Sequence, residues 1–146
     1  MILNECTLKW FKIDERAKIP TKTDAAAGYD IYTIEDNITI PAHTTYMFRT
    51  GLAVAPSEGY WLMAFDRGST GSKGLHVHCG VVDNDYRGEI IVALKNTSFD
   101  SYEVKNGDRI AQIVFLSTII FDDIIAADDL SKSERGIGGF GSTGNR

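Results

Sequence analysis

Apolar residues recur along the chain in short runs, and these runs are broken by Gly, Pro and polar turn-forming residues. Several runs alternate with polar positions or are rich in aromatic and β-branched residues, which favours strands over helices. We expect strands within 2–13, 29–32, 38–40, 46–55 with a bend at Gly51, 60–65, 76–78, 81–82, 90–96 and 109–115. Many short strands at such close spacing predict an all-β sandwich or barrel.

The stretch 80–92 places charged and turn-forming residues between two apolar runs. Val81 and Val82 enter it and Ile90 and Ile91 leave it, so we predict a β-hairpin with a charged tip. Asp, Asn and Gly are ordinary hairpin residues and account for most of this loop. A large flat ring is not needed to close a hairpin. Tyr86 therefore stands out as a ring, beside two carboxylates, that could face a sugar or a base.

A second polar segment, residues 66–74, directly follows a strongly apolar strand. Its small residues allow a ligand to approach the backbone, and Arg67 and Lys73 supply positive charge. If Ser69 caps a short helical turn, the free N–H groups of that turn would point at an anion. A plain polar loop is the alternative reading, and the spacing is not that of a Walker loop.

Three further polar groups have open interpretations. Asp30 lies among strand formers, either as a solvent-facing carboxylate or as a carboxylate near a metal-bound phosphate. His76 and His78 share one face of a strand, but no further His or Cys cluster completes a metal site, so we expect surface or interface histidines. Arg109 and Gln112 fall on opposite faces of their strand by the two-residue period.

Composition narrows the function classes. The 146 residues are enough for one domain with a real core. A net charge of −5 argues against general nucleic-acid binding but permits a local phosphate site. No apolar run approaches the ~20 residues that span a membrane, so we expect no membrane partner. No signal peptide is visible, so we expect a cytoplasmic protein with Cys6 and Cys79 reduced.

The chain ends in a Gly-rich segment that cannot form a core of its own. We therefore divide the chain into a barrel domain, residues 1–130, and a mobile arm, residues 131–146. A disordered tail is the simple interpretation. The arm also carries Arg135 to pair with phosphate, Phe140 to stack on a base, and glycines that permit close wrapping, which is what closure over a nucleotide requires.

Five segments in this order, 26–32, 67–73, 80–88, 107–112 and 135–144, resemble the five motifs of the trimeric dUTP pyrophosphatase (dUTPase) family. The match spans nearly the whole chain. Any one motif is a weak signal, whereas five in register are a strong one. One position departs from the pattern: Gly68 stands where the second motif usually has Ser, and Ser69 follows it.

The resemblance implies a distorted jelly-roll β-barrel, assembled as a homotrimer whose active sites are each built from three subunits. It implies Mg²⁺-dependent hydrolysis of dUTP to dUMP and pyrophosphate, which limits uracil in DNA and supplies dUMP for thymidylate synthesis. Asp83 would hold the water that attacks the α-phosphorus, and Asp30 would act through waters around Mg²⁺. The substrate-binding residues implied are Arg67, Gly68, Ser69, Gly80, Val81, Val82, Tyr86, Ile91, Gln112, Arg135, Phe140, Gly141 and Ser142.

Two alternatives remain at this point. A dCTP deaminase resembles dUTPases in fold, and release of ammonia from dCTP would reveal it. A nucleotide-gated regulatory protein is the other, in which closure of the arm changes a surface for a protein partner. Binding of such a partner would depend on dUTP.

Overall fold

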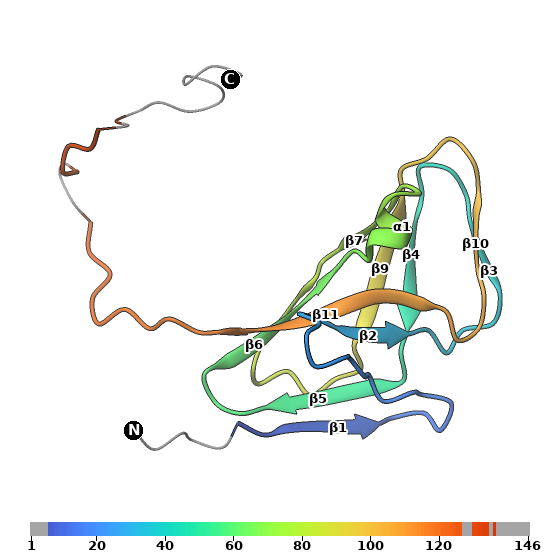
Figure 1. Cartoon of the computed structure of the whole chain (residues 1–146), viewed down its shortest axis with the longest axis horizontal. Helices are drawn as coiled ribbons and strands as arrows, with labels where there is room; N and C mark the ends of the chain where they lie inside the picture. The colour runs from blue at the N-terminus through green and yellow to red at the C-terminus, as the bar shows by residue number, and fades with distance from the viewer. Residues whose placement is uncertain (1–5, 127–129, 135, 137–146) are drawn as a thin grey trace.

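The computed structural model describes residues 6–126, 130–134 and 136, and this part of the chain is almost entirely β-structure (Figure 1). Its single helix is one short turn, α1 (Gly68–Gly71). The strands are β1 (Leu8–Lys12), β2 (Tyr29–Tyr32), β3 (Ile38–Ile40), β4 (Thr45–Arg49), β5 (Leu52–Pro56), β6 (Tyr60–Phe65), β7 (Leu75–His78), β8 (Val81–Val82), β9 (Ile91–Asn96), β10 (Tyr102–Val104) and β11 (Arg109–Ser117). The all-β prediction is confirmed.

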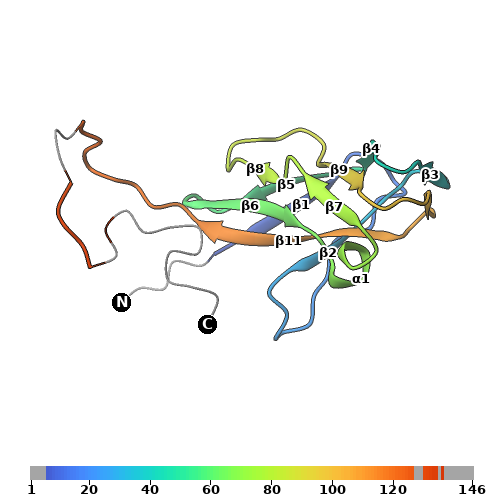
Figure 2. The same ribbon diagram turned by 90° about the horizontal axis from the view of Figure 1, so that it is seen from above.

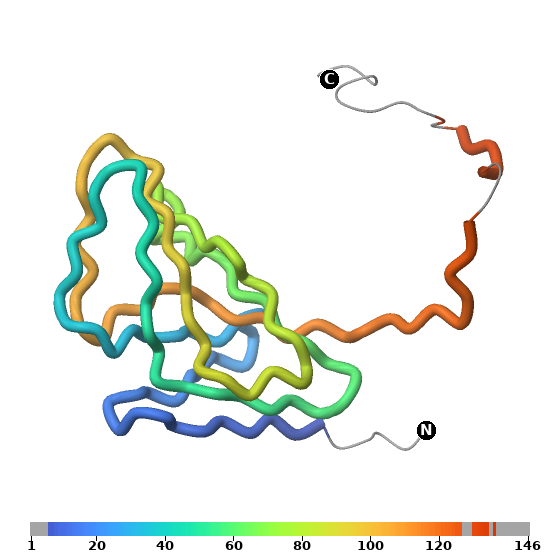
Figure 3. The backbone as a smooth tube through the Cα atoms, turned by 180° about the vertical axis from the view of Figure 1, so that it is seen from behind, coloured from blue at the N-terminus to red at the C-terminus, as the bar shows by residue number. Residues whose placement is uncertain are grey.

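The strands form antiparallel sheets whose neighbours are mostly distant in sequence. One sheet has the order β2-β11-β6-β8 and another the order β4-β9-β7. Two ribbons, β1-β5 and β10-β3, complete the barrel. Seen from behind, the β10-β3 ribbon lies at one end of the molecule and β1-β5 runs along one edge (Figure 3). Strand β11 pairs with both β2 and β6, so it is the central strand that joins the early and middle parts of the chain.

The core lies between these sheets and is made of aliphatic side chains with one large ring, Phe48. In β6 the buried positions alternate, because Leu62 and Ala64 point inward while their neighbours are more exposed. Fully burying one such leucine stabilises the fold by roughly 1.5–3 kcal/mol. Other fully buried side chains are Ile31, Ile40, Leu52, Leu75, Ile90, Val92, Leu94, Ile110 and Ile113.

The predicted bend at Gly51 is present and separates two strands of different sheets. Gly51 has φ +68°, and a Cβ there would lie 3.0 Å from the Cβ atoms of both Ala17 and Asp14. Only glycine accepts this conformation without strain. The bend therefore passes the chain from β4, which pairs with β9, to β5, which pairs with β1.

The hairpin predicted for 80–92 is only partly correct. The chain does reverse there, but the paired residues lie further out, in β7 and β9, where His78 is opposite Ala93. Val81 and Val82 instead pair with Met63 and Leu62 of β6. Tertiary pairing thus prevails over the local pairing that the apolar runs suggested. Residues 83–90 become a loop between two sheets.

Two details of the last strands were also missed. Strand β10 was not predicted, because three residues with one buried position carry almost no periodic signal. The prediction that Arg109 and Gln112 lie on opposite faces is wrong. A register shift between Arg109 and Ala111 breaks the two-residue period, so Arg109 opposes Tyr32 while Gln112 opposes Asp30.

Beyond β11 the chain leaves the barrel as an extended segment (Figure 1). Its large apolar side chains are 71–93% exposed, namely Ile119, Ile120, Phe121, Ile124 and Ile125. Among the described residues, no helix has the length and apolar character needed to cross a bilayer.

Candidate active site

The segment after β6 forms the predicted helical turn, but the turn begins two residues earlier than expected. Arg67, with φ −87° and ψ 144°, is the N-cap residue, and its carbonyl accepts hydrogen bonds from the N–H groups of Thr70 and Gly71 at 3.1 and 2.8 Å. Ser69 therefore lies inside the turn, and the prediction that it is the cap is wrong. The amides of Gly68 and Ser69 open the turn and have no intrahelical acceptor.

The guanidinium of Arg67 is held in a fixed orientation by two neighbours. Its Nε donates to Oδ1 of Asp30 at 2.8 Å, and its Nη1 donates to Oγ of Ser69 at 3.0 Å. The second oxygen of Asp30 accepts a hydrogen bond from Nη1 of Arg109 at 3.1 Å. Asp30 is thus the centre of an ion-pair network rather than a free carboxylate facing solvent, and two cations around one anion leave the site positive.

A second set of contacts fixes the base of this loop. Gln112 Nε2 donates to the carbonyl of Asp66 at 2.8 Å. The Asp66 carboxylate contacts Nδ1 of His76 at 2.7 Å and accepts the backbone N–H of Val77 at 2.5 Å. His76 is therefore half-buried and paired, whereas His78 is exposed as predicted. No group of three or more metal-binding side chains occurs in the described residues.

A separate pocket of about 240 Å³ lies beside the loop between β8 and β9. Five predicted site residues line it, together with Met47, Cys79, Glu89 and Ile90. Those five are Val81, Val82, Asp83, Tyr86 and Ile91. Asp83 therefore borders a mostly apolar pocket whose size can accommodate a single-ring base.

The shape of this pocket depends on two glycines that the sequence made conspicuous. A side chain at Gly80 would run into the carbonyl of Ala64, because β8 lies close against β6. A side chain at Gly88 would run into the ring of Tyr86, whose hydroxyl donates to the carbonyl of Glu89 at 3.0 Å. Glycine at these two positions therefore lets the backbone beside the pocket lie close to β6 and to Tyr86.

Sequence reasoning missed Glu89. Its carboxylate accepts the N–H of Gly51 at 2.7 Å and Nε of Arg49 at 3.2 Å. It therefore ties the end of the pocket loop to the bend after β4. A lone Glu in a loop carries no local signal for this, because both partners are about 40 positions away in sequence.

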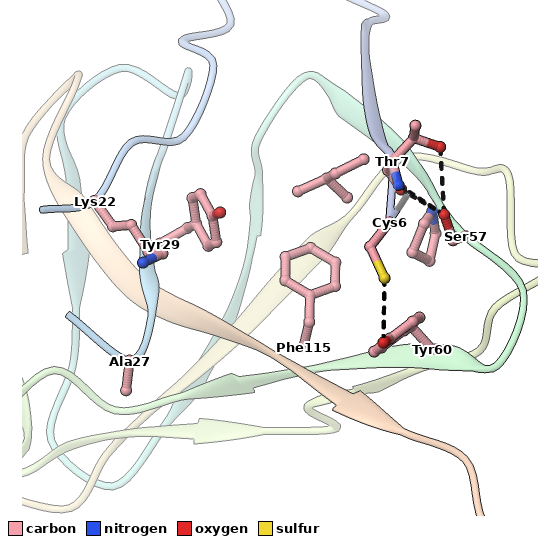
Figure 4. A pocket seen from close by; sticks show the side chains of 10 residues that line it. Cys6, Thr7, Lys22, Ala27, Tyr29, Ser57, Tyr60 and Phe115 are labelled. Carbon is pink, nitrogen blue, oxygen red and sulfur yellow. Dashed lines mark hydrogen bonds between the residues drawn. The ribbon is translucent and has the colours of Figure 1, made fainter. Parts of the chain in front are cut away.

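Another pocket, of about 330 Å³, lies between β1, β6 and β11 (Figure 4). Tyr29, Tyr60 and Phe115 form aromatic walls. A hydrogen bond from Cys6 to the hydroxyl of Tyr60, 3.3 Å long, raises the pKa of Tyr60 above its usual value. These walls hold none of the predicted site residues.

Within one chain the two halves of the predicted site are not brought together. The loop with Arg67 and Ser69 lines a polar pocket of about 170 Å³ that shares no residue with the pocket of Asp83 and Tyr86. In the view from above, α1 and β8 lie on different sides of the molecule (Figure 2). The remaining predicted residues, Arg135, Phe140, Gly141 and Ser142, lie outside the described part of the chain.

Fold and site together define a class of protein. It is an all-β protein with a cationic loop suited to phosphate, and with an apolar pocket for a flat ring beside a carboxylate. These are the parts that recognition and hydrolysis of a nucleotide require.

Comparison with known proteins gives the family. The dUTPase family model matches residues 14–144, so the chain belongs to the dUTPase family. A deoxyuridine 5'-triphosphate nucleotidohydrolase of Candida albicans is 44% identical over 142 residues, which are 94% of this chain and 88% of that protein.

Solved structures agree on the fold. The dUTPase of Staphylococcus bacteriophage 80alpha with dUPNHPP superposes with a TM-score of 0.85 at 27% identity, covering 94% of this chain and 98% of that one. A dUTPase mutant of phage phi11 of S. aureus, described with a structural Mg(II) ion, gives 0.76 at 21% identity and covers 86% of this chain and 99% of that one. The jelly-roll prediction is confirmed at the level of the fold.

Proposed function

We propose that this dUTPase hydrolyses dUTP to dUMP and pyrophosphate by attack of a water that Asp83 holds against the α-phosphorus. The water oxygen bonds to phosphorus, the bond to the bridging oxygen of the β-phosphate breaks, and pyrophosphate leaves. Carboxylates are weak bases at neutral pH, so Asp83 contributes mainly by orienting the water and accepting its proton. The observation that carries the proposal is the position of Asp83 at the pocket.

The same pocket supports selection of the base and the sugar. Uracil fits between the apolar side chains of Val81 and Ile91, with backbone groups near Gly80 and Ile91 reading its edge. A cytosine amino group would oppose the wrong partners, and unpaired polar groups discriminate more strongly than size. Tyr86, held by Glu89, lies under the deoxyribose and leaves no room for a 2′-hydroxyl.

The cationic loop supports binding of the triphosphate. Arg67 is already oriented by Asp30 and Ser69, and a planar guanidinium binds phosphate oxygens in a fixed geometry. The free amides of Gly68 and Ser69 add donors beside it. Gln112 braces the loop through Asp66, so its contribution to binding is partly one of support.

Magnesium fits an indirect role here. Both oxygens of Asp30 accept hydrogen bonds from arginines, and the surrounding charge disfavours a directly bound cation. A carboxylate retains further lone pairs, so Asp30 could hold waters of a Mg²⁺ that sits mainly on phosphate oxygens. When bound there, the ion would neutralise charge that develops on the phosphates.

We further propose that the active sites are shared within a homotrimer. Asp83 and Arg67 belong to separate pockets of one chain, so a complete site requires the loop of another copy. The exposed apolar segment 119–125 supports this assembly, because large exposed apolar patches mark interfaces. Arg135 and Phe140 of the arm would then close over the nucleotide.

The test is pyrophosphate release from dUTP, dTTP, dCTP and UTP with Mg²⁺. We expect turnover of dUTP alone, and a loss of at least about 100-fold in Asp83→Asn. Binding of the imido analogue dUPNHPP should remain, because Asp83 acts on the water. Asp85→Asn, the same change on the next carboxylate of the loop, is the matched control. Undiminished turnover in Asp83→Asn would contradict the assignment.

A further inference from the structure

The side chain of Asn84 links the loop of Asp83 to a different part of the barrel. Its Nδ2 donates to the carbonyl of Ser57 at 2.9 Å and to that of Tyr60 at 2.6 Å. Two carbonyl acceptors require the NH₂ end of the amide, so the orientation of this side chain is settled by its partners. Asn84 is half-buried, whereas Asp83 and Asp85 on either side are exposed.

The partner of Asn84 is the turn between β5 and β6, residues 57–60, which is itself fixed on two sides. The N–H of Ser57 donates to the carbonyl of Thr7 at 2.9 Å, and Ser57 Oγ also contacts Thr7. On the other side, the N–H of Thr118 donates to the carbonyl of Gly59 at 2.7 Å. The turn is therefore tied to both ends of the barrel chain and offers a rigid reference point.

The loop of Asp83 has few other attachments. Its start is held by the pairing of Val82 with Leu62, and its end by Glu89. Arg87 donates to the carbonyls of Asn84 and Tyr86 at 2.5 and 3.0 Å, but these bonds are internal to the loop. Among the described contacts of residues 83–88, the Asn84 side chain supplies the hydrogen bonds to another element.

We propose that Asn84 is a positioning residue for Asp83, an inference that rests on the proposed role of Asp83. Asn84 does not touch the substrate. It anchors the loop one residue beyond Asp83, so the direction of the Asp83 carboxylate depends on the two hydrogen bonds to the 57–60 turn. A misplacement of about 1 Å at a reacting group can cost on the order of 100-fold in rate.

Two substitutions at this position separate positioning from folding. Asn84→Ala removes both donors. Asn84→Asp keeps the shape but turns a carboxylate oxygen toward two carbonyl oxygens, which repel it at neutral pH. We expect the kcat for dUTP to fall by about 10- to 100-fold in both variants. The KM and the affinity for dUPNHPP should stay within about threefold, because the base and phosphate contacts remain.

The pH profile provides a signature that a merely structural role would not produce. A protonated carboxyl can donate one hydrogen bond to the turn. The rate of Asn84→Asp relative to the unmodified protein should therefore rise as the pH falls, whereas the relative rate of Asn84→Ala should stay flat. If either variant fails to fold, Asn84→Ser can replace it in the test, because serine is smaller but keeps one hydrogen-bond donor. Asn84→Ser should retain more turnover than Asn84→Ala.

Controls distinguish failure of this inference from failure of the proposed function. Asp85→Asn, in the same loop but exposed, should leave kcat unchanged. If Asp83→Asn keeps full turnover, the role of Asp83 is wrong. If Asp83→Asn is inactive while all the Asn84 variants keep a normal kcat, the positioning role is wrong. A parallel loss of melting temperature and analogue affinity would assign Asn84 to folding alone and overturn the proposal.

Discussion

The carboxylate of Asp30 supports the proposed site by orienting arginine side chains, without contacting the reacting atoms. Its oxygens hold Arg67 and Arg109, which come from different parts of the chain. The sequence left two interpretations open for Asp30, and neither included this role. Ion pairs between residues 37 and 79 positions apart have no local pattern from which to predict them.

Asp30→Asn tests this role. We expect KM for dUTP to rise about tenfold at saturating Mg²⁺, equivalent to about 1.4 kcal/mol, because Arg67 loses its charged partner. The Mg²⁺ concentration at half-maximal rate, measured in the same assay, reports whether Asp30 also holds waters of the ion. Asp36→Asn, a change at an exposed carboxylate, should alter neither quantity. An unchanged KM would contradict the orienting role.

The departure from the family pattern at Gly68 also has a physical reading at this scale. A Cβ at Gly68 would meet open space, so glycine is not needed there for room. Ser69 places its hydroxyl against Arg67, 3.0 Å from Nη1. This contact supports a shift of the serine by one position, with the hydroxyl still beside the guanidinium.

Among the elements, β8 shows most clearly what sequence reasoning could and could not reach. Its two valines were correctly predicted as a strand, and Asp83 and Tyr86, which the sequence also singled out, line the pocket beside it. The partner strand was wrong, since β8 pairs with β6. The apolar pattern identifies a strand and its buried face, but it carries no information on which distant strand supplies the hydrogen bonds.

Gly80→Ala should destabilise the protein by about 1–3 kcal/mol, because the new methyl group would push β8 away from the carbonyl of Ala64. The matched control is Gly68→Ala, which meets open space and should be neutral or slightly stabilising, since alanine favours a helical turn. Urea unfolding of the two variants measures both effects. Equal stability of the two variants would contradict the close packing of β8.

For the whole molecule, the separation of Asp83 from Arg67 has a measurable consequence. Two inactive proteins, Asp83→Asn and Arg67→Ala, should regain activity when their subunits are mixed and reassembled. A site is complete when the subunit that supplies Asp83 is the Arg67→Ala variant and the subunit that supplies Arg67 is the Asp83→Asn variant. In an equal mixture each condition is met with a probability of about one half, so we expect about one quarter of normal activity.

Each variant put through the same unfolding and refolding alone is the control and should stay inactive. Sedimentation at the mixing concentration confirms that trimers have formed. Reassembled trimers with no recovered activity would show that each chain builds its own site. The family resemblance already implied that different subunits share each site, and the separation of the two pockets within one chain supports that prediction.

The position of β11 inside the largest sheet affects how the chain folds while it is being synthesised. Strand β2 has no neighbour in that sheet until β11 has been made, more than 80 residues later, because the register joins Asp30 to Gln112. At synthesis rates of about 5–20 residues per second, β2 waits for several seconds without its partner strand. Closing such distant pairs is slow, typically milliseconds to seconds for all-β domains. The nascent chain therefore completes its barrel only after Ser117 has emerged from the ribosome.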